Sequence, residues 1–277
     1  MTQLTPKEIA ILNEFCEAEA WANYCLQAPA TCKDQLKVEV KQVGSIWVSM
    51  VSALDWAFFN RIVGLGMKED ATESMLDDAI GILQNAGCTN YMAQICPQAQ
   101  PAGQIPEWLS QRGLLKSRNW AKLYRGNEAA PVVSTSLRVE SIGEEFSDAF
   151  SEIVLKAFEM PDELKCLIGA PIGKPGWSGY LAFDGKEPVS AAAMFISGET
   201  CWLGFGSTLE THRNRGGQGA LFARRIADGL KLGCKWFVTE AAEDTPESPN
   251  PSYHNMLRTG FKLAYQRPNY VHQGKPN

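Results

Sequence analysis

Arginine and glycine are concentrated in one short stretch of the chain, Arg213-Asn214-Arg215-Gly216-Gly217-Gln218-Gly219-Ala220. A strand-like apolar segment precedes it and an amphipathic, helix-like segment follows it. The first turn of a helix has backbone N–H groups without partners and a partial positive charge. Glycines let phosphate oxygens approach the backbone, and arginines add charge-assisted hydrogen bonds. The stretch predicts a phosphate-binding loop, with a glycine-rich turn carrying solvated arginines as the alternative.

Two other phosphate-binding loops do not fit this stretch. A Walker loop needs Gly-Lys-Ser/Thr at its end, which this stretch lacks. A Rossmann fingerprint needs a parallel strand–helix–strand context. The strands before this loop are separated by hairpin-like turns at Asp184-Gly185 and Ser197-Gly198-Glu199, which favours antiparallel pairing.

Residues 132–271 resemble the GNAT superfamily of acetyl-CoA-dependent N-acyltransferases. The resemblance rests on the strand Leu203 to Leu209, on Arg213-x-x-Gly216-x-Gln218-Gly219-Ala220, and on the ending Asn255-Met256-Leu257-Arg258-Thr259-Gly260-Phe261. The family pattern is Gln/Arg-x-x-Gly-x-Gly/Ala, and Gln218 departs from it in the last slot. The implied fold class is α/β, of the α+β type: two GNAT-like domains, each with a mixed, mostly antiparallel sheet flanked by helices.

The resemblance implies acetyl-CoA as co-substrate and no metal. The loop residues implied to bind its pyrophosphate are Arg213, Asn214, Arg215, Gly216, Gly217, Gln218, Gly219 and Ala220. The backbone of Ser207, Thr208 and Leu209 would pair with the pantetheine arm like an added strand. A backbone N–H near Leu209 would polarise the thioester carbonyl, and Asn255 and Ser252 would contact the arm. The implied reaction moves an acetyl group, by direct attack, to the amine of an unidentified, small acceptor.

The attacking amine must be neutral, although a lysine-like amine has a pKa of about 10. The resemblance implies that the strand ending at Leu209 and the strand ending at Glu240 splay apart, and that the pantetheine arm enters the gap between them. Glu240 faces this gap and is the first candidate for the base; its alternative is a solvated strand-end carboxylate. Glu243, Asp244 and His254 are weaker candidates for the same role.

The departing thiolate needs a proton, and the family often supplies it from a tyrosine four residues before the Gly-Phe pair. Met256 stands in that position, which puts this step in doubt. Tyr253 and Tyr265 are the candidates that remain, and each is otherwise a packed aromatic residue. Three more aromatic residues either line an acceptor pocket or belong to the core: Trp177, Trp202 and Phe205.

The two halves of the chain end alike, which indicates two copies of one domain, with coincidence as the alternative. A helix ends at Gly87 in one half and at Gly233 in the other, and Gly113 and Gly260 precede the two last strands. Residues 125–131, Arg-Gly-Asn-Glu-Ala-Ala-Pro, form the best linker candidate. The predicted domains are therefore residues 1–125, a degenerate GNAT-like domain, and 132–277, which binds acetyl-CoA. Acidic residues replace the Arg/Gly loop in the first domain and would repel a pyrophosphate: Glu69, Asp70, Glu73, Asp77 and Asp78.

Helices and strands at regular spacing must position these residues. Thr5 and Glu8 form a capping box at the start of the first helix, and Asp70 and Glu73 indicate a second one. Further helices are predicted near 106–113, 144–158, 220–232 and 252–259. The predicted strands are 37–43, 88–96, 114–124, 132–142, 180–184, 189–196, 201–209, 235–240 and 261–271.

Composition limits the partners and the location of the protein. The 277 residues carry a formal net charge of −5, which gives no reason to expect nucleic acid or a membrane as the main partner. No apolar run is long enough to span a bilayer, and the first residues do not resemble a signal peptide, so a cytoplasmic protein with reduced, mostly buried thiols is expected. The oligomeric state stays open, and a homodimer is one state that the sequence allows.

The sequence is also compatible with two other interpretations. Met256 in the tyrosine position favours a non-catalytic acyl-CoA-binding or regulatory protein of the same fold. The other alternative is a structural duplication in which neither domain has a CoA site.

Overall fold

One continuous sheet connects the two halves of the chain. A computed structural model describes residues 4–274, and within this range eleven strands pair in the order β1-β2-β3-β4-β11-β5-β10-β9-β8-β7-β6. Their bounds are β1 Val38–Val43, β2 Ile46–Val51, β3 Arg61–Val63, β4 Tyr91–Gln94, β5 Leu115–Arg125, β6 Arg138–Ile142, β7 Trp177–Asp184, β8 Glu187–Ser197, β9 Thr200–Thr208, β10 Trp236–Ala242 and β11 Lys262–His272.

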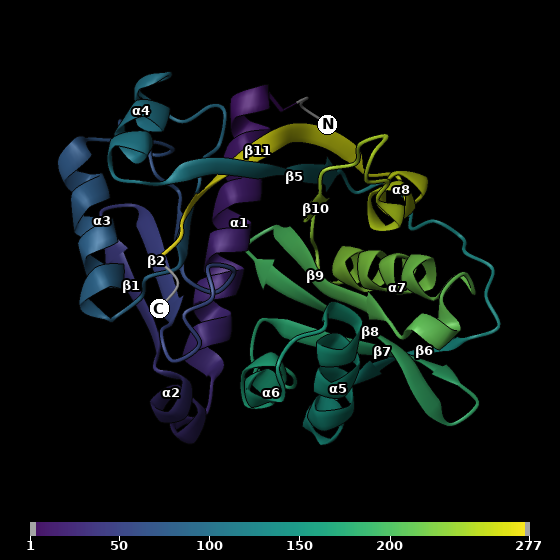
Figure 1. The fold of residues 1–277 in the computed structure, drawn as a ribbon. Helices are drawn as coiled ribbons and strands as arrows, with labels where there is room; N and C mark the ends of the chain where they lie inside the picture. Colours follow the sequence, from purple (N-terminus) through teal and green to yellow (C-terminus); the bar gives the residue numbers. More distant parts are fainter. Residues whose placement is uncertain (1–3, 275–277) are drawn as a thin grey trace.

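Helices cover this sheet, and α1 runs along the middle of the molecule between the two groups of helices (Figure 1). The α-helices are α1 Pro6–Gln27, α2 Ala30–Leu36, α3 Glu73–Asn85, α4 Gln104–Gln111, α5 Ser147–Phe158, α6 Lys165–Ile168, α7 Gly217–Lys231 and α8 Pro251–Arg258. Short 3-10 helices are η1 Glu144–Phe146, η2 Asp162–Leu164 and η3 Glu210–His212. Side chains alternate along β7: Leu181 packs in the core that includes α1 and α5, and Tyr180 packs in the core that includes α7.

The last strands of the two halves are exchanged. β5 lies between β10 and β11 and is antiparallel to both, whereas β11 continues the sheet to β4 of the first half. Each half therefore completes its part of the sheet with a strand from the other. The predicted domain boundary between 125 and 132 stays a prediction, and the two segments on either side of it share one hydrogen-bonded sheet.

The two halves repeat one order of elements. In each half a strand is followed by a helix and by a parallel neighbour, β3 with β4 and β9 with β10. The helix between them ends at a glycine with positive φ, +86° at Gly87 and +89° at Gly233. Gly113 and Gly260, which precede β5 and β11, have φ of +78° and +87°. These positions require glycine because other residues rarely adopt such angles.

One of the two predicted capping boxes is correct. At the start of α1, the Thr5 side chain accepts from the Glu8 backbone N–H, and the Glu8 carboxylate accepts from the Thr5 N–H. The box predicted at Asp70 is wrong, because α3 begins at Glu73 and its cap is Thr72. Thr72 is the extended residue directly before the helix, so its hydroxyl reaches the Met75 N–H.

The prediction that all thiols are reduced is wrong for one pair. Cys32 of α2 and Cys166 of α6 form a disulfide that joins the two halves of the chain. The other six cysteines are free and buried.

Among residues 4–274, no helix combines the length and the apolar character that a membrane span requires.

A buried group of charged side chains lies where α1 crosses the exchanged strands. Glu17 of α1 accepts hydrogen bonds from Lys122 of β5 and from both terminal nitrogens of Arg267 of β11, at 2.6 Å and 3.0 Å for the latter. Arg61 of β3 lies 3.5 Å from the same carboxylate. Glu14 accepts a further bond from Arg267 at 3.1 Å, and all five side chains are inaccessible to solvent. Burial would raise the pKa of Glu17, but Arg267 and Lys122 lower it below its ordinary value.

Glu17→Gln should reduce the free energy of unfolding by about 3 kcal/mol, because three buried cations lose their common carboxylate. The lowered pKa of Glu17 means that its stabilisation is present above the pKa of an unfolded glutamate and is lost as the pH falls. The difference in the free energy of unfolding between the variant and the wild type should therefore become smaller as the pH falls. Urea unfolding at several pH values measures this difference. Glu39→Gln, which removes one partner of the exposed Glu39–Lys41 pair, is the control. Equal effects of the two substitutions would contradict this role of Glu17.

Candidate active site

Strands β9 and β10 separate in the middle of the sheet, as the resemblance to the GNAT superfamily implied. They pair in parallel from Thr200 and Trp236 to Trp202 and Val238, and beyond that point they diverge. The Thr239 hydroxyl donates to the carbonyl of Leu203 at 2.7 Å just past the last pair. The gap that follows opens two adjacent cavities, one toward α7 and α8 and one toward α1.

A β-bulge shapes the β9 side of this gap. The register of β8 and β9 shifts between Ala191 and Ala193, and Phe205 has a φ of +56°, which is rare for a bulky residue. Gly204 is required here, since a Cβ atom on it would lie 1.9 Å from the ring of Trp202. Backbone outliers of this kind are concentrated at functional sites.

Arg225 of α7 donates hydrogen bonds to the backbone of the bulge. It is fully buried, and its Nη1 donates to the carbonyls of Ala193 and Gly204 at 3.0 Å and 3.2 Å. Its Nη2 has no hydrogen-bond partner among the described residues, and a Cβ on Gly206 would lie 4.0 Å from it. Burial lowers the pKa of Arg225. The sequence reasoning missed this residue, because only the structure shows a buried guanidinium without a carboxylate beside the gap.

The start of α7 is open to a ligand. Gly216, with a φ of +80°, precedes the helix, and no side chain in the described part of the chain caps the first turn. The N–H groups of the first turn have no intrahelical acceptor, so they are free to bind an anion. The corresponding helix of the first half, α3, is capped by Thr72.

The chain itself covers the start of α3. The Gln100 carbonyl accepts from the Ala71 N–H at 2.7 Å, and a Cβ on Gly66 would lie 2.4 Å from the same oxygen. The Gln100 backbone thus lies directly against the segment that leads into α3, and the expectation that the first half does not hold CoA stays a prediction.

A groove of about 940 Å³ lies beside the start of α7. The residues lining it that the sequence predicted are Ser207, Thr208, Arg213, Asn214, Gly216, Gly217, Gln218, Gly219, Ser252 and Asn255. The sequence reasoning missed Arg258 of α8 and residues 131–134, which also line it. The strand predicted over 132–142 is shorter in the structure, because β6 begins only at Arg138. Arg258 lies in the stretch 255–261 that carries the resemblance, so its position in the sequence could have suggested it. No sequence pattern indicates that residues 131–134 run beside the groove.

Two predicted cofactor contacts are engaged elsewhere. Arg215 forms a two-point ion pair with Asp184, with N–O distances of 2.5 Å and 3.1 Å, which lowers the pKa of Asp184. Among the described residues, Arg213 lines the groove and Arg215 does not. The Leu209 N–H donates to the Val189 carbonyl at 3.0 Å, so it is not available to polarise a thioester. Ala220 is buried in α7.

Gln218, the departure from the family pattern, connects α7 to α8. Its Nε2 donates to the Ser252 hydroxyl at 2.7 Å, and its Oε1 accepts from Asn255 at 2.5 Å. Asn250 caps α8 by accepting from the backbone N–H groups of Ser252 and Tyr253. The amide of Gln218 thus fixes the wall of the groove, a role that glycine or alanine could not have.

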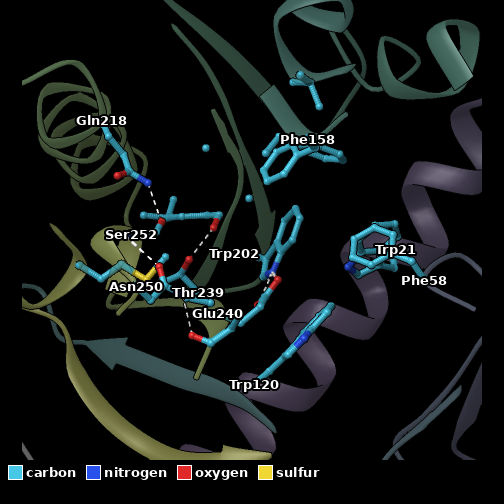
Figure 2. Close-up of a pocket in the computed structure, with 18 of the residues that line it drawn as sticks. Trp21, Phe58, Trp120, Phe158, Trp202, Gln218, Thr239, Glu240, Asn250 and Ser252 are labelled. Carbon is cyan, nitrogen blue, oxygen red and sulfur yellow. Dashed lines mark hydrogen bonds between the residues drawn. The ribbon is translucent and has the colours of Figure 1, made fainter. Parts of the chain in front are cut away.

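A second cavity, of about 420 Å³, lies on the other side of the gap and shares Phe158, Gly206, Gln218, Asn250 and Ser252 with the groove. Glu240 reaches it from β10, and Figure 2 shows its carboxylate between the rings of Trp202 and Trp120. Trp202 and Phe205 line the cavity as predicted. Trp177 packs behind them, with ring centroids 6.1 Å and 6.3 Å away, and donates its N–H to Asn23.

The environment of Glu240 favours a basic carboxylate. Trp202 Nε1 donates to both of its oxygens, and Lys122 Nζ donates to Oε2 at 3.1 Å. Its side chain is 12% exposed. Burial and the neighbouring charge of Glu17 raise the pKa of Glu240 against the effect of Lys122.

The two predicted tyrosines lie outside the cavity walls that the described residues form. Tyr265 is buried on β11, where its hydroxyl donates to Glu14 at 2.7 Å, and burial raises its pKa further. Tyr253 packs against the core beside α7 and against the ring of His254. The side chain in the family's tyrosine position, Met256, does line the cavity.

The weaker base candidates are also engaged. Glu243 accepts hydrogen bonds from Asn119, and Asp244 lies 3.2 Å from His254.

Solved structures resemble the chain over most of its length. A GCN5-related N-acetyltransferase from Kribbella flavida has a TM-score of 0.65 at 14% identity, with 94% of this chain and 95% of that chain covered. One from Sphaerobacter thermophilus has a TM-score of 0.60 at 10% identity, covering 84% and 79%. A tandem GNAT protein from the clavulanic acid biosynthesis pathway has a TM-score of 0.53 at 13% identity, with the same coverage. No protein-family model and no curated protein matches the chain. The chain therefore has the GNAT fold, and the predicted fold class is confirmed.

Arg213→Ala should weaken binding of acetyl-CoA about 10-fold, since one charge-assisted hydrogen bond to phosphate is lost. Arg215→Ala should have a smaller effect, because Arg215 is held by Asp184. Lys68→Ala, in the segment before α3 of the first half, is the control and should leave the affinity for acetyl-CoA unchanged. Isothermal titration calorimetry measures all three. A larger loss for Arg215→Ala than for Arg213→Ala would contradict this division of the loop.

Proposed function

We propose that the protein is an acetyl-CoA-dependent N-acyltransferase that moves an acetyl group to the amine of a small acceptor. The observation that carries this proposal is the meeting of two cavities at the gap between β9 and β10. One has an uncapped helix start and Arg213, which suit a pyrophosphate. The other holds Glu240, a buried carboxylate with a raised pKa. The resemblance of the fold to GNAT acetyltransferases supports the same function.

The residues present fit acetyl-CoA. The groove offers the free N–H groups of Gly217, Gln218 and Gly219 together with Arg213 and Arg258. The β9 edge beyond Trp202 has left its partner strand, so its backbone groups can pair with an amide-bearing arm. When bound, the thioester supplies an activated acetyl group at the gap. The role predicted for Leu209 is not part of this proposal, because its N–H is already used.

Glu240 accepts the proton of the amine as the new N–C bond forms and the C–S bond breaks. The leaving sulfur departs as a thiolate, and a simple thiol has a pKa of only about 8.5, so its demand for an acid is modest. Arg225, which has no carboxylate partner among residues 4–274, contributes positive charge beside the gap and positions the bulge. This division of roles needs neither Tyr253 nor Tyr265.

A non-catalytic acyl-CoA-binding protein is the second candidate. The observation in its favour is Met256, which lines the cavity at the position of the family's usual tyrosine. Release of CoA in the presence of an amine separates the two functions.

Glu240→Gln should lower kcat/KM for the amine about 100-fold and leave the Kd of acetyl-CoA unchanged, since a proton acceptor is lost and the groove is intact. In the wild type, kcat/KM should rise with pH as Glu240 loses its proton, with a midpoint above the ordinary pKa of glutamate, because burial raises that pKa. This rise should be missing in the variant. Glu243→Gln, a neighbouring carboxylate bonded to Asn119, is the matched control. A wild-type rate and pH profile in Glu240→Gln would rule out this base.

A further inference from the structure

The cavity that holds Glu240 has an aromatic wall, and much of this wall comes from the first half of the chain. Trp21 of α1, Trp56, Phe58 and Phe59 of the segment after β2, and Trp120 of β5 line one side. Phe158, Trp202 and Phe205 from the second half also line the cavity, and Trp21 packs against Trp202 and Phe205 with ring centroids 6.3 Å and 6.2 Å apart. Figure 2 shows the rings of Trp202 and Trp120 on either side of Glu240, with the rings of Trp21, Phe58 and Phe158 farther from its carboxylate. A cavity of this composition recognises an apolar body.

Most polar groups in this cavity are already bonded to the protein. The Thr239 hydroxyl donates to the Leu203 carbonyl, and Asn250 donates to the Ala242 carbonyl and caps α8. Gln218 and Ser252 bond to each other. Glu240 is the one carboxylate among the described residues that line the cavity. The cavity therefore offers one anionic group, suited to one amine.

A buried cation lies behind the first-half wall. The Arg61 guanidinium lies 3.8 Å from the ring centre of Trp21, 4.5 Å from that of Phe58 and 5.2 Å from that of Trp120. These rings already interact with one positive charge, so a second cation against their other faces would meet like-charge repulsion. Arg118, which is exposed, adds another positive charge to the lining. The wall thus suits a neutral ring system and disfavours a polyamine.

Resting on the proposed function, we propose that the acceptor is a monoamine whose amino group is carried by a short chain on a flat, apolar ring system. The ring lies among the aromatic side chains, and the amine faces Glu240. In this arrangement the first half of the chain, which lacks a usable pyrophosphate loop, determines acceptor specificity. Its aromatic wall is kept rigid by Arg61, which is itself close to Glu17.

The test compares 2-phenylethylamine and tryptamine with spermidine and ethanolamine as acceptors for acetyl-CoA. The aryl amines should have a kcat/KM at least ten-fold above that of the other two. Trp56→Ala, at an exposed edge of the wall, and Trp120→Leu should each raise KM for tryptamine at least ten-fold and leave KM for acetyl-CoA unchanged. Trp108→Ala, a tryptophan on α4 outside the cavity lining, should change neither.

Two outcomes overturn the inference and leave the proposed function standing: turnover that favours spermidine or ethanolamine, or wild-type KM for tryptamine in both wall variants. Calorimetry with each amine alone and with acetyl-CoA alone separates the remaining cases. Absence of acetyl-CoA binding would contradict the proposed function, whereas tryptamine binding that the wall variants weaken would still support the aromatic site. Absence of tryptamine binding, or its binding without transfer when acetyl-CoA also binds, would overturn these amines as acceptors.

Discussion

The contact of Glu17 with three buried cations is the interaction on which the rest of the structure depends. Arg61, Lys122 and Arg267 come from β3, β5 and β11, and unpaired burial of any of them would be costly. The exchanged strands β5 and β11 bring Lys122 and Arg267 to this common carboxylate on α1. Lys122 also bonds to Glu240, so the same group of charges that joins the halves sets the position of the candidate base.

Strand exchange has a functional consequence. It places β5, with Trp120, directly beside β10, with Glu240, so residues of the first half stand in front of the gap between β9 and β10. In the proposed function the second half binds the acyl donor and both halves enclose the acceptor. The first half has a capped α3 with the Gln100 backbone against Ala71, and in the proposal it contributes aromatic side chains to the acceptor site rather than a donor site.

Local features of the fold could be predicted from the sequence. The Arg/Gly stretch, the hairpin turns and the glycines at both helix ends all act over a few residues, and the structure has the corresponding loop, strands and positive φ angles. Strand exchange could not be predicted, because β5 and β11 both have the pattern of ordinary strands and each pairs with residues far away in the sequence. For the same reason, the sequence around Arg61, Lys122 and Arg267 does not indicate that these side chains are buried together beside Glu17. The predicted role of Arg215 in phosphate binding depended on the orientation of one side chain, which Asp184 determines from another strand.

A crystal structure of the protein with CoA tests the central claim most directly. The pyrophosphate should lie against the N–H groups of Gly217 to Gly219 beside Arg213, and the sulfur should lie in the gap between Gly206 and Glu240. A pyrophosphate bound elsewhere, or a sulfur that does not reach the cavity of Glu240, would contradict acyl transfer at this site.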